Sequence, residues 1–359
     1  MRAMLLSGIS DLREVSEPLT LSEVPVPTIA GNEVLIRIHT CGVCHTELDE
    51  IEGRTPPPHF PVIPGHQVVG RIERSGQDVS KFSVGDRVGV AWIHSACGTC
   101  EQCRKGLPNL CGRFAATGRD RNGGYAEYIG APESSVYPIP DIFTDEEAAP
   151  LLCAGAIGYR SLKLTQLTNG QNLGLSGFGA SGHQVMKMAL SLYPDSSVYV
   201  FARSGKERAF ALELGAAWSG DTSEKPPEKL QAIIDTTPVW TPVVEALKHL
   251  ESGGRLVINA IRKEEVDKEV LLDLSYHDQL WMEKEIKSVA NITPRDVSEF
   301  LELAARIKLK PELQVYYLED ANQALLDLKR GGVRGAKVLR ISDSSPPSNS
   351  LTIHSHPLT

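Results

Sequence analysis

A glycine-rich turn between a buried strand and a helix constrains this chain more than any other feature. The segment Leu173-Gly-Leu-Ser-Gly177-Phe-Gly179-Ala-Ser-Gly182 joins an apolar run to the spacing G-x-G-x-x-G. From here on, short apolar runs alternate with helical patterns, at 172–176, 182–192, 197–201, 206–214, 232–234, 243–250 and 255–258. We expect the helix over 243–250 to end near Gly253-Gly254. This alternation predicts an α/β fold with a doubly wound parallel sheet.

Residues 1–150 follow a different pattern and predict a β-rich unit. Short β-branched runs at 33–39, 68–72 and 86–90 are separated by prolines and glycines, which suggests a partly closed barrel. The pattern changes near residue 145, where Thr144 is a plausible helix N-cap. We therefore expect a first domain over 1–150, a nucleotide-type domain over 151–292, a return to the first domain over 293–341, and a disordered Ser/Pro-rich tail over 342–359.

Composition narrows the choice of partners. The 359 residues carry a formal net charge of −8, which offers no electrostatic footprint for nucleic acid. No apolar run approaches the ~18 residues that span a bilayer, and the N-terminus lacks the apolar core of a signal peptide. We expect a cytoplasmic protein without nucleic-acid or membrane partners.

Four cysteines form the most specific motif in the chain. Cys97, Cys100, Cys103 and Cys111 lie close together in sequence, and four thiolates suit a closed tetrahedral zinc site. An iron–sulfur cluster and two disulfides are the alternatives. The bacterial cluster pattern ends in Cys-Pro, whereas Gly112 follows Cys111, and disulfides are rare in the cytosol. The motif favours structural zinc.

Two further cysteines and a histidine could form a second metal site. Cys44 and Pro64-Gly-His66 each follow a predicted strand, and Cys153 precedes the nucleotide-type unit. Taken singly, each has an ordinary alternative, since isolated cysteines usually pack in cores and isolated histidines are usually satisfied polar residues. Together they would leave a fourth tetrahedral position open, as in catalytic zinc sites.

The glycine-rich turn also predicts a dinucleotide site. Gly177 permits the tight turn, Gly179 lets the backbone approach a pyrophosphate, and Gly182 allows close packing of helix on strand. Ala180 and Ser181 complete the helix N-terminus that faces the anion. The next strand ends in Phe201-Ala-Arg203-Ser204, with no acid for the ribose hydroxyls. Arg203 and Ser204 thus favour NADP(H) over NAD(H), unless Arg203 is only a solvated turn residue.

These motifs together resemble the zinc-dependent medium-chain alcohol dehydrogenases, and the Trp92 segment is similar to the yeast-type and propanol-preferring bacterial members. The resemblance covers residues 1–341 and rests on these segments: 41–46, 64–66, 85–88, 97–111, 150–155 and 177–182. It implies a GroES-like catalytic domain with a Rossmann domain, two Zn²⁺ per chain, and a homodimer or homotetramer. The implied activity is reversible hydride transfer between a nicotinamide cofactor and a short primary alcohol or aldehyde.

The resemblance also implies a role for each site residue. Cys44, His66 and Cys153 match the catalytic zinc ligands, while Cys41 lies outside the set and is expected to pack. Thr46 matches the hydroxyl that contacts the substrate oxygen and starts the proton relay. His45 matches a pyrophosphate contact. Trp92 matches a pocket aromatic whose bulk implies a narrow site.

Four positions depart from the family pattern. Glu47 replaces the usual Asp and is expected to orient His66 from a slightly different position. Gln67 replaces the Glu that often follows the histidine ligand, so an acid near the metal is missing. Asp49 stands where the relay often ends in His, so protons could leave through Asp49 or directly to water. Ile157 replaces a Thr that often packs on the nicotinamide.

Two alternative functions remain open from the sequence. One is a zinc-free quinone or enoyl reductase of the same fold, against which the joint presence of the three ligand candidates argues. The other is a non-catalytic nucleotide-binding relative, which would have no need for an open metal site.

Overall fold

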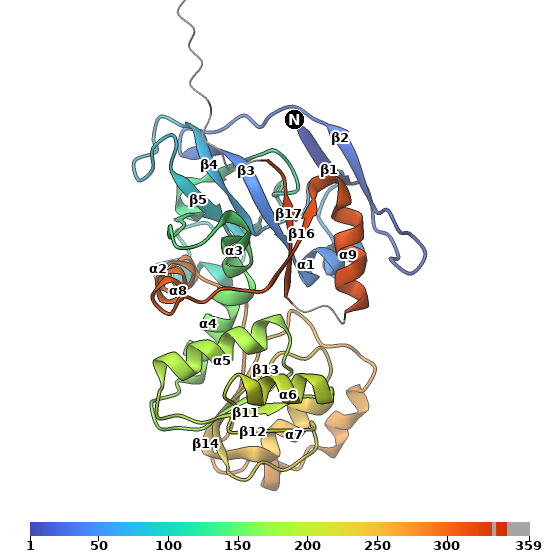
Figure 1. Cartoon of the computed structure of the whole chain (residues 1–359), viewed down its shortest axis with the longest axis vertical. Coiled ribbons are helices and arrows are strands. Elements are labelled where there is room, and N and C mark those ends of the chain that lie inside the picture. The colour runs from blue at the N-terminus through green and yellow to red at the C-terminus, as the bar shows by residue number, and fades with distance from the viewer. Residues whose placement is uncertain (332–334, 343–359) are drawn as a thin grey trace, which may run out of the picture.

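The computed structural model describes residues 1–331 and 335–342. Of the predicted tail at 342–359, residues 343–359 lie outside this range. The two large β-sheets lie at opposite ends of the molecule, and helices lie between them (Figure 1). No helix within the described ranges has the length and apolar character needed to cross a bilayer.

The lower sheet in Figure 1 confirms the doubly wound prediction. Its six strands are all parallel and lie in the order β12-β11-β10-β13-β14-β15. They are β10 (Leu173–Ser176), β11 (Val198–Phe201), β12 (Trp218–Gly220), β13 (Leu230–Asp235), β14 (Leu250–Ile258) and β15 (Glu285–Ser288). The strand order reverses beside β10, and ligands of such sheets bind at the carboxyl end of this position.

Helices α4 (Ala154–Thr165), α5 (Ala180–Leu192), α6 (Gly205–Glu213) and α7 (Thr241–His249) accompany this sheet. The expected end of α7 near Gly253-Gly254 was wrong. The helix stops at His249, and β14 begins at once and runs through both glycines. Gly253 adopts φ +70°, and the pairing register of β13 with β14 shifts nearby, so these glycines accommodate an irregular strand.

The upper sheet in Figure 1 is mostly antiparallel and combines strands from both ends of the chain. Its order is β16-β17-β3-β4-β5-β9, and β8 also pairs with β3. The strands are β3 (Glu33–Val43), β4 (Val68–Ser75), β5 (Arg87–Val90), β8 (Tyr128–Pro132), β9 (Val136–Pro138), β16 (Leu313–Tyr317) and β17 (Ala336–Arg340). Because β17 pairs with β3, the last described strand lies beside the strand that leads to Cys44.

Smaller elements complete the described chain. The strands are β1 (Arg2–Leu6), β2 (Leu19–Glu23), β6 (Ile93–Ser95) and β7 (Ala115–Ala116). The helices are α1 (His45–Ile51), α2 (Glu101–Arg104), α3 (Asp145–Ala148), α8 (Pro294–Arg306) and α9 (Ala321–Arg330). The short helices are η1 (Pro108–Leu110), η2 (Glu133–Ser135), η3 (Ala149–Leu152), η4 (Lys268–Asp273), η5 (Tyr276–Leu280) and η6 (Leu318–Asp320).

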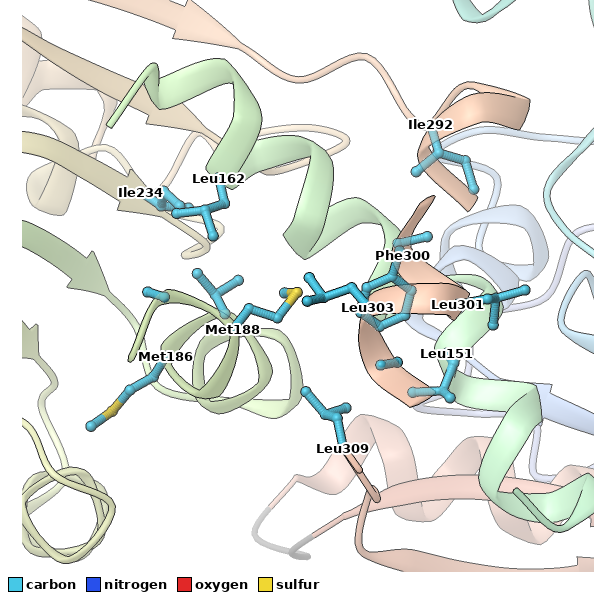
Figure 2. Packing of buried hydrophobic residues seen from close by; sticks show 14 of the residues in the cluster. Leu151, Leu162, Met186, Met188, Ile234, Ile292, Phe300, Leu301, Leu303 and Leu309 are labelled. Atoms are coloured by element: carbon cyan, nitrogen blue, oxygen red, sulfur yellow. The ribbon is translucent and has the colours of Figure 1, made fainter. Parts of the chain in front are cut away.

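A continuous apolar core joins the two ends of the molecule. Figure 2 shows Phe300 and Leu303 of α8 beside Leu151 of η3, with Met188 of α5 and Leu162 of α4 nearby. Phe300 is fully buried, and a Cβ placed on Gly155 would come within 2.3 Å of its ring. Close packing of this kind fixes η3 and α4 against α8, and Cys153 lies at the junction of η3 and α4.

A buried polar network ties β3 to α3. His39 Nδ1 of β3 lies 2.8 Å from Asp145 Oδ2, and Arg87 Nε donates to Asp145 Oδ1 at 2.7 Å. Arg87 also donates to the Phe143 carbonyl at 2.7 Å. Burial acts to raise the pKa of Asp145, but the His39 hydrogen bond and the Arg87 charge outweigh it and lower that pKa. The network links the strand before Cys44 to the helix that leads toward Cys153.

Candidate metal and dinucleotide sites

Three distant segments bring two sulfurs and an imidazole together. Cys44 is the N-cap of α1, His66 lies in the loop before β4, and Cys153 lies between η3 and α4. Their potential ligand atoms all lie within 4.8 Å of one another, and the sulfurs of Cys44 and Cys153 are 3.8 Å apart. The loop before His66 turns at Gly65, which has φ +96° and packs against Tyr125.

Glu47 connects the start of α1 to His66. Its Oε2 accepts a hydrogen bond from the Cys44 backbone N–H at 2.7 Å, and its Oε1 lies 2.7 Å from His66 Nδ1. Both side chains are almost fully buried. Burial acts to lower the pKa of His66, but the charge of Glu47 and contacts with Cys44 outweigh it and raise that pKa well above its usual range. Glu47 thus has the position needed to orient the imidazole through Nδ1.

The donor set fits a metal ion. His66 is buried, and because its Nδ1 faces Glu47, Nε2 is the nitrogen left to join the two sulfurs as a ligand. Hydrogen bonding to Cys153 and to His66 lowers the pKa of Cys44 well below its usual value despite burial. Two sulfurs and one nitrogen form the ligand set of an open zinc site.

Three other predicted residues of this centre lie on α1. The Thr46 hydroxyl is buried and lies 3.6 Å from Cys44 Sγ. His45 is exposed at the start of α1. Asp49 is mostly buried, forms an ion pair with Arg54, and lies 3.6 Å from Arg262 Nε. Asp49 is therefore already paired with two cations.

Three further residues singled out from the sequence lie in different segments. Trp92 is half-buried, and its ring centroid lies 5.2 Å from that of Phe114. Gln67 is buried against Gly42 of β3. Ile157 is half-buried on α4, where its N–H donates to the Cys153 carbonyl at 2.8 Å. The last bond places Ile157 one helical turn beyond the third ligand candidate.

The four-cysteine motif forms a separate compact lobe. The sulfurs of Cys97, Cys100, Cys103 and Cys111 all lie within 4.8 Å of one another. All seven cysteines of the chain are free. Backbone N–H groups donate to three of these sulfurs, including Cys100 N to Cys97 Sγ at 3.3 Å, and such bonds stabilise thiolates. They lower the pKa of Cys97 to about 5. Asn109 Nδ2 fastens the lobe to the Ala290 carbonyl at 2.7 Å.

The glycine-rich turn lies at the carboxyl end of β10. Gly177 has φ +83°, and a Cβ there would approach Thr236 Oγ1 at 2.8 Å. A Cβ on Gly182 would meet the Gly177 carbonyl at 2.8 Å, whereas Gly179 borders open space. Helix α5 begins at Ala180 and continues through Ser181. The side chains of these two residues lie outside the described part of the structure. A phosphate can therefore approach the backbone at Gly179.

The turn after β11 carries an exposed arginine. Arg203 and Ser204 are both exposed, and Ser204 is the N-cap of α6. Arg208 donates to the carbonyls of Ala202 and Arg203 at 2.8 and 3.1 Å. It thereby braces the turn that presents Arg203.

Two charged residues near the centre, Glu50 and Arg119, were not predicted from the sequence. Glu50 on α1 is 1% exposed, and its Oε1 has no hydrogen-bond partner among the described residues. Burial raises the pKa of Glu50 well above its usual value, Glu47 raises it further, and His66 and Arg119 act in the opposite direction. Arg119 lies against Trp92. For Arg119, the signal in the sequence was the charged segment Arg119-Asp-Arg just before Gly123-Gly124.

This architecture, a β-rich unit with a cysteine lobe joined to a doubly wound sheet, defines a medium-chain dehydrogenase fold. Residues 30–141 match the family model described as alcohol dehydrogenase GroES-like domain, which confirms the GroES-like prediction. A probable alcohol dehydrogenase of Mycobacterium tuberculosis is 41% identical over 329 residues, covering 90% of this chain and 93% of that protein. An alcohol dehydrogenase of Geobacillus stearothermophilus is 35% identical, covering 92% and 98%.

A solved structure agrees with these relatives. The alcohol dehydrogenase of Aeropyrum pernix aligns with a TM-score of 0.80 and 25% identity, covering 95% of this chain and all of that one. The chain belongs to the zinc-type medium-chain alcohol dehydrogenase family, as its motifs predicted. The protein is thus an oxidoreductase that interconverts alcohols and aldehydes.

Proposed function

We propose that this alcohol dehydrogenase acts at a zinc centre formed by Cys44, His66 and Cys153, with short primary alcohols and aldehydes as substrates. The observation that carries the proposal is the convergence of three ligand atoms within 4.8 Å from segments far apart in sequence. The setting of His66 supports it, because the side chain is buried and Glu47 engages Nδ1, which leaves Nε2 to face the two sulfurs. Neither a zinc-free reductase nor a nucleotide-binding module needs this convergence.

Bound zinc would polarise the substrate oxygen, and a nicotinamide cofactor would accept or donate the hydride. The protein's own residues would then position the substrate and move the proton. Thr46 is suited to hydrogen-bond the substrate oxygen because its hydroxyl lies 3.6 Å from Cys44 Sγ. Glu47 would hold His66 through Nδ1 so that Nε2 faces the metal.

The proton from Thr46 could pass to Asp49 or to water. Asp49 is paired with Arg54 and Arg262, and both guanidinium groups already engage its Oδ1. We therefore favour proton transfer from Thr46 to water, with Asp49 orienting the residues around α1.

We propose NADP(H) as the preferred cofactor, held at the turn from Gly177 to Gly182. Support comes from the open approach at Gly179 and from Arg203, Ser204 and the braced turn that Arg208 forms. His45 at the start of α1 would contact the pyrophosphate. Comparison of kcat/KM with NADPH and NADH checks this, and a tenfold preference for NADH would contradict it.

A second zinc ion is proposed for the four-cysteine lobe, where it would have a structural role. Four sulfurs leave no open position for substrate. We also propose that the domains divide near residues 150 and 292, and that the protein is cytoplasmic, where its free cysteines would persist.

We further propose a homodimer or homotetramer built at the edge strand β15. All four residues of β15 are exposed, and an exposed strand edge invites pairing with another chain. Large exposed apolar side chains gather in the same part of the sequence: Ile261, Val266, Leu272, Tyr276, Trp281, Met282 and Ile286. Sedimentation of the protein at several concentrations tests this assembly.

The central test compares two cysteine variants. Cys153→Ser should abolish alcohol oxidation and remove one of two bound zinc ions, while the dinucleotide still binds. Cys41→Ala is the matched control, because Cys41 is buried near Cys44 but outside the ligand group. Full activity in Cys153→Ser, or an equal loss in Cys41→Ala, would refute the proposed centre.

A further inference from the structure

An arginine side chain lies against Trp92, the residue that the family resemblance matches to an aromatic of the substrate pocket. Arg119 Cζ lies 5.8 Å from the ring centroid of Trp92 and 5.8 Å from that of Phe114. Aromatic faces attract a guanidinium, and the attraction grows where water is excluded. Only 25% of the Arg119 side chain is exposed. Arg119 thus belongs to the wall around Trp92 and is mostly withdrawn from solvent.

The loop that carries Arg119 is fastened to the segment that carries His66. Gly124 N donates to the Gly65 carbonyl, and Tyr125 N donates to the Pro64 carbonyl, both at 2.9 Å. A Cβ on Gly118 would come within 2.8 Å of the Gly65 nitrogen. At the other side, Thr117 N donates to the Trp92 carbonyl at 2.8 Å. The backbone before Arg119 therefore touches the residue next to His66.

Asp120 holds one edge of the guanidinium and leaves the other edge available. Nη2 donates to Asp120 Oδ2 at 2.9 Å and to Oδ1 at 3.2 Å, and Nε donates to Oδ2 at 3.3 Å. The two N–H groups of Nη1 have no hydrogen-bond partner within residues 1–331 and 335–342. A guanidinium has five N–H donors in a rigid fork, so the Asp120 contact orients the free Nη1 donors without using them.

We propose that Arg119 is a specificity-determining residue that binds a carboxylate on the substrate, so that the enzyme prefers short oxo acids and hydroxy acids to purely apolar aldehydes and alcohols. The proposal rests on the proposed function, because it requires the substrate to lie beside Trp92 at the zinc centre. Charge-assisted hydrogen bonds to a guanidinium are stronger than neutral ones. The aromatic rings reduce the water around Arg119, which strengthens the attraction. Trp92 still limits the length of the substrate.

The test uses zinc-loaded enzyme with its nicotinamide cofactor and two aldehydes of equal size. One is succinic semialdehyde, and the other carries an isopropyl group in place of the carboxylate. The wild-type enzyme should reduce the acid with a kcat/KM about tenfold to a hundredfold higher, as expected for a charge-assisted hydrogen bond. Arg119→Leu should remove this preference, mainly by raising KM for the acid, so that kcat/KM falls far more for the acid than for the apolar aldehyde.

Two further variants separate recognition from a structural role. Arg119→Lys keeps the charge but loses the forked donors, so it should restore part of the preference. Arg121→Leu is the matched control, because Arg121 is exposed in the same loop and should keep the full preference. An equal loss for both aldehydes in Arg119→Leu would show that Arg119 only supports the loop.

Failure of this proposal can be told apart from failure of the proposed function. Equal kcat/KM for the two aldehydes in the wild-type enzyme would overturn the role of Arg119 and leave the zinc centre intact. If neither aldehyde is reduced, calorimetry with γ-hydroxybutyrate and the reduced cofactor still tests recognition, since no turnover occurs. Wild-type protein should then bind this hydroxy acid about tenfold more tightly than Arg119→Leu does, and equal affinities would overturn the proposal.

Discussion

The two cysteine clusters use similar ligands but depend on the fold in different ways. The lobe holds four sulfurs within residues 97–111, and short backbone turns bring them together. The ligands of the other centre, Cys44, His66 and Cys153, come from three segments that lie far apart in the sequence. A local site can form from its own loop, whereas the second centre forms only when the two sheets and the core between them are in place.

The largest expected effect separates the clusters by activity. Cys44→Ser should lower kcat/KM about a thousandfold or more, because a metal contributes several kcal/mol to charge stabilisation in the transition state. Cys100→Ser in the lobe should retain substantial activity in the fraction that stays folded. Steady-state kinetics with zinc analysis on both variants checks this. The contrast fails if Cys100→Ser loses turnover as completely as Cys44→Ser while remaining folded.

For stability, the lobe should matter more than the three-residue centre. Cys100→Ser should lower the melting temperature more than Cys44→Ser does, since metal binding in a lobe without its own core is folding free energy. A loss of about 3 kcal/mol is expected, at the scale of one strong structural contact. Calorimetric melts of both variants provide the comparison. A larger loss in Cys44→Ser would show that the central site, and not the lobe, depends on metal to fold.

The buried network of His39, Arg87 and Asp145 offers a third comparison. Asp145→Asn should destabilise the protein by about 3 kcal/mol, because it breaks a buried pair with Arg87 and removes the partner of His39. Zinc should be lost from the Cys44 centre before it is lost from the lobe. Metal analysis after dialysis against a weak chelator measures the order of release, and simultaneous release would contradict the proposed link.

Acid should weaken the same buried network, because it protonates Asp145. The pKa of Asp145 is lowered in the folded state from its ordinary value of 3.8. Its contribution to stability is therefore complete above that value and is lost as pH falls through the lower, folded-state pKa. Melting curves recorded down through this range should show a smaller acid loss in Asp145→Asn than in wild type. Identical acid profiles would assign the acid sensitivity to other groups.

A smaller effect is expected from the residue that orients the imidazole. Glu47→Gln should reduce zinc affinity or activity about tenfold to a hundredfold, the usual cost of losing an outer-shell carboxylate. Metal content of the lobe should not change. Glu50→Gln is a useful control on the same helix, because Glu50 is buried but lies outside the contact with His66. If the two variants behave alike, burial of charge explains the effect and orientation of His66 does not.

Local patterns carried most of the information that the sequence provided. Thr144 was predicted to cap a helix, and it does so with Glu147 in a reciprocal capping box. The strand at 172–176 and the following glycine turn were predicted because apolar runs and glycine spacing are local signals. The lobe belongs to the same class, since its four ligands follow one another along the chain.

Features that depend on tertiary pairing were harder to predict. The short strand β15 is exposed along its length and has no buried alternation to detect, so it was missed. The end of α7 was misplaced because glycines inside β14 resemble a helix stop. Arg119 and Trp92 are 27 positions apart and meet only through loop packing. For the three-segment centre, the family resemblance supplied what the residues alone left open.

Anomalous diffraction at the zinc edge from crystals of the purified protein tests the central claim most directly. The account predicts two zinc positions per chain, one bound by Cys97, Cys100, Cys103 and Cys111, and the other by Cys44, His66 and Cys153. A single peak in the lobe, with Cys44, His66 and Cys153 close together but without metal, would contradict it.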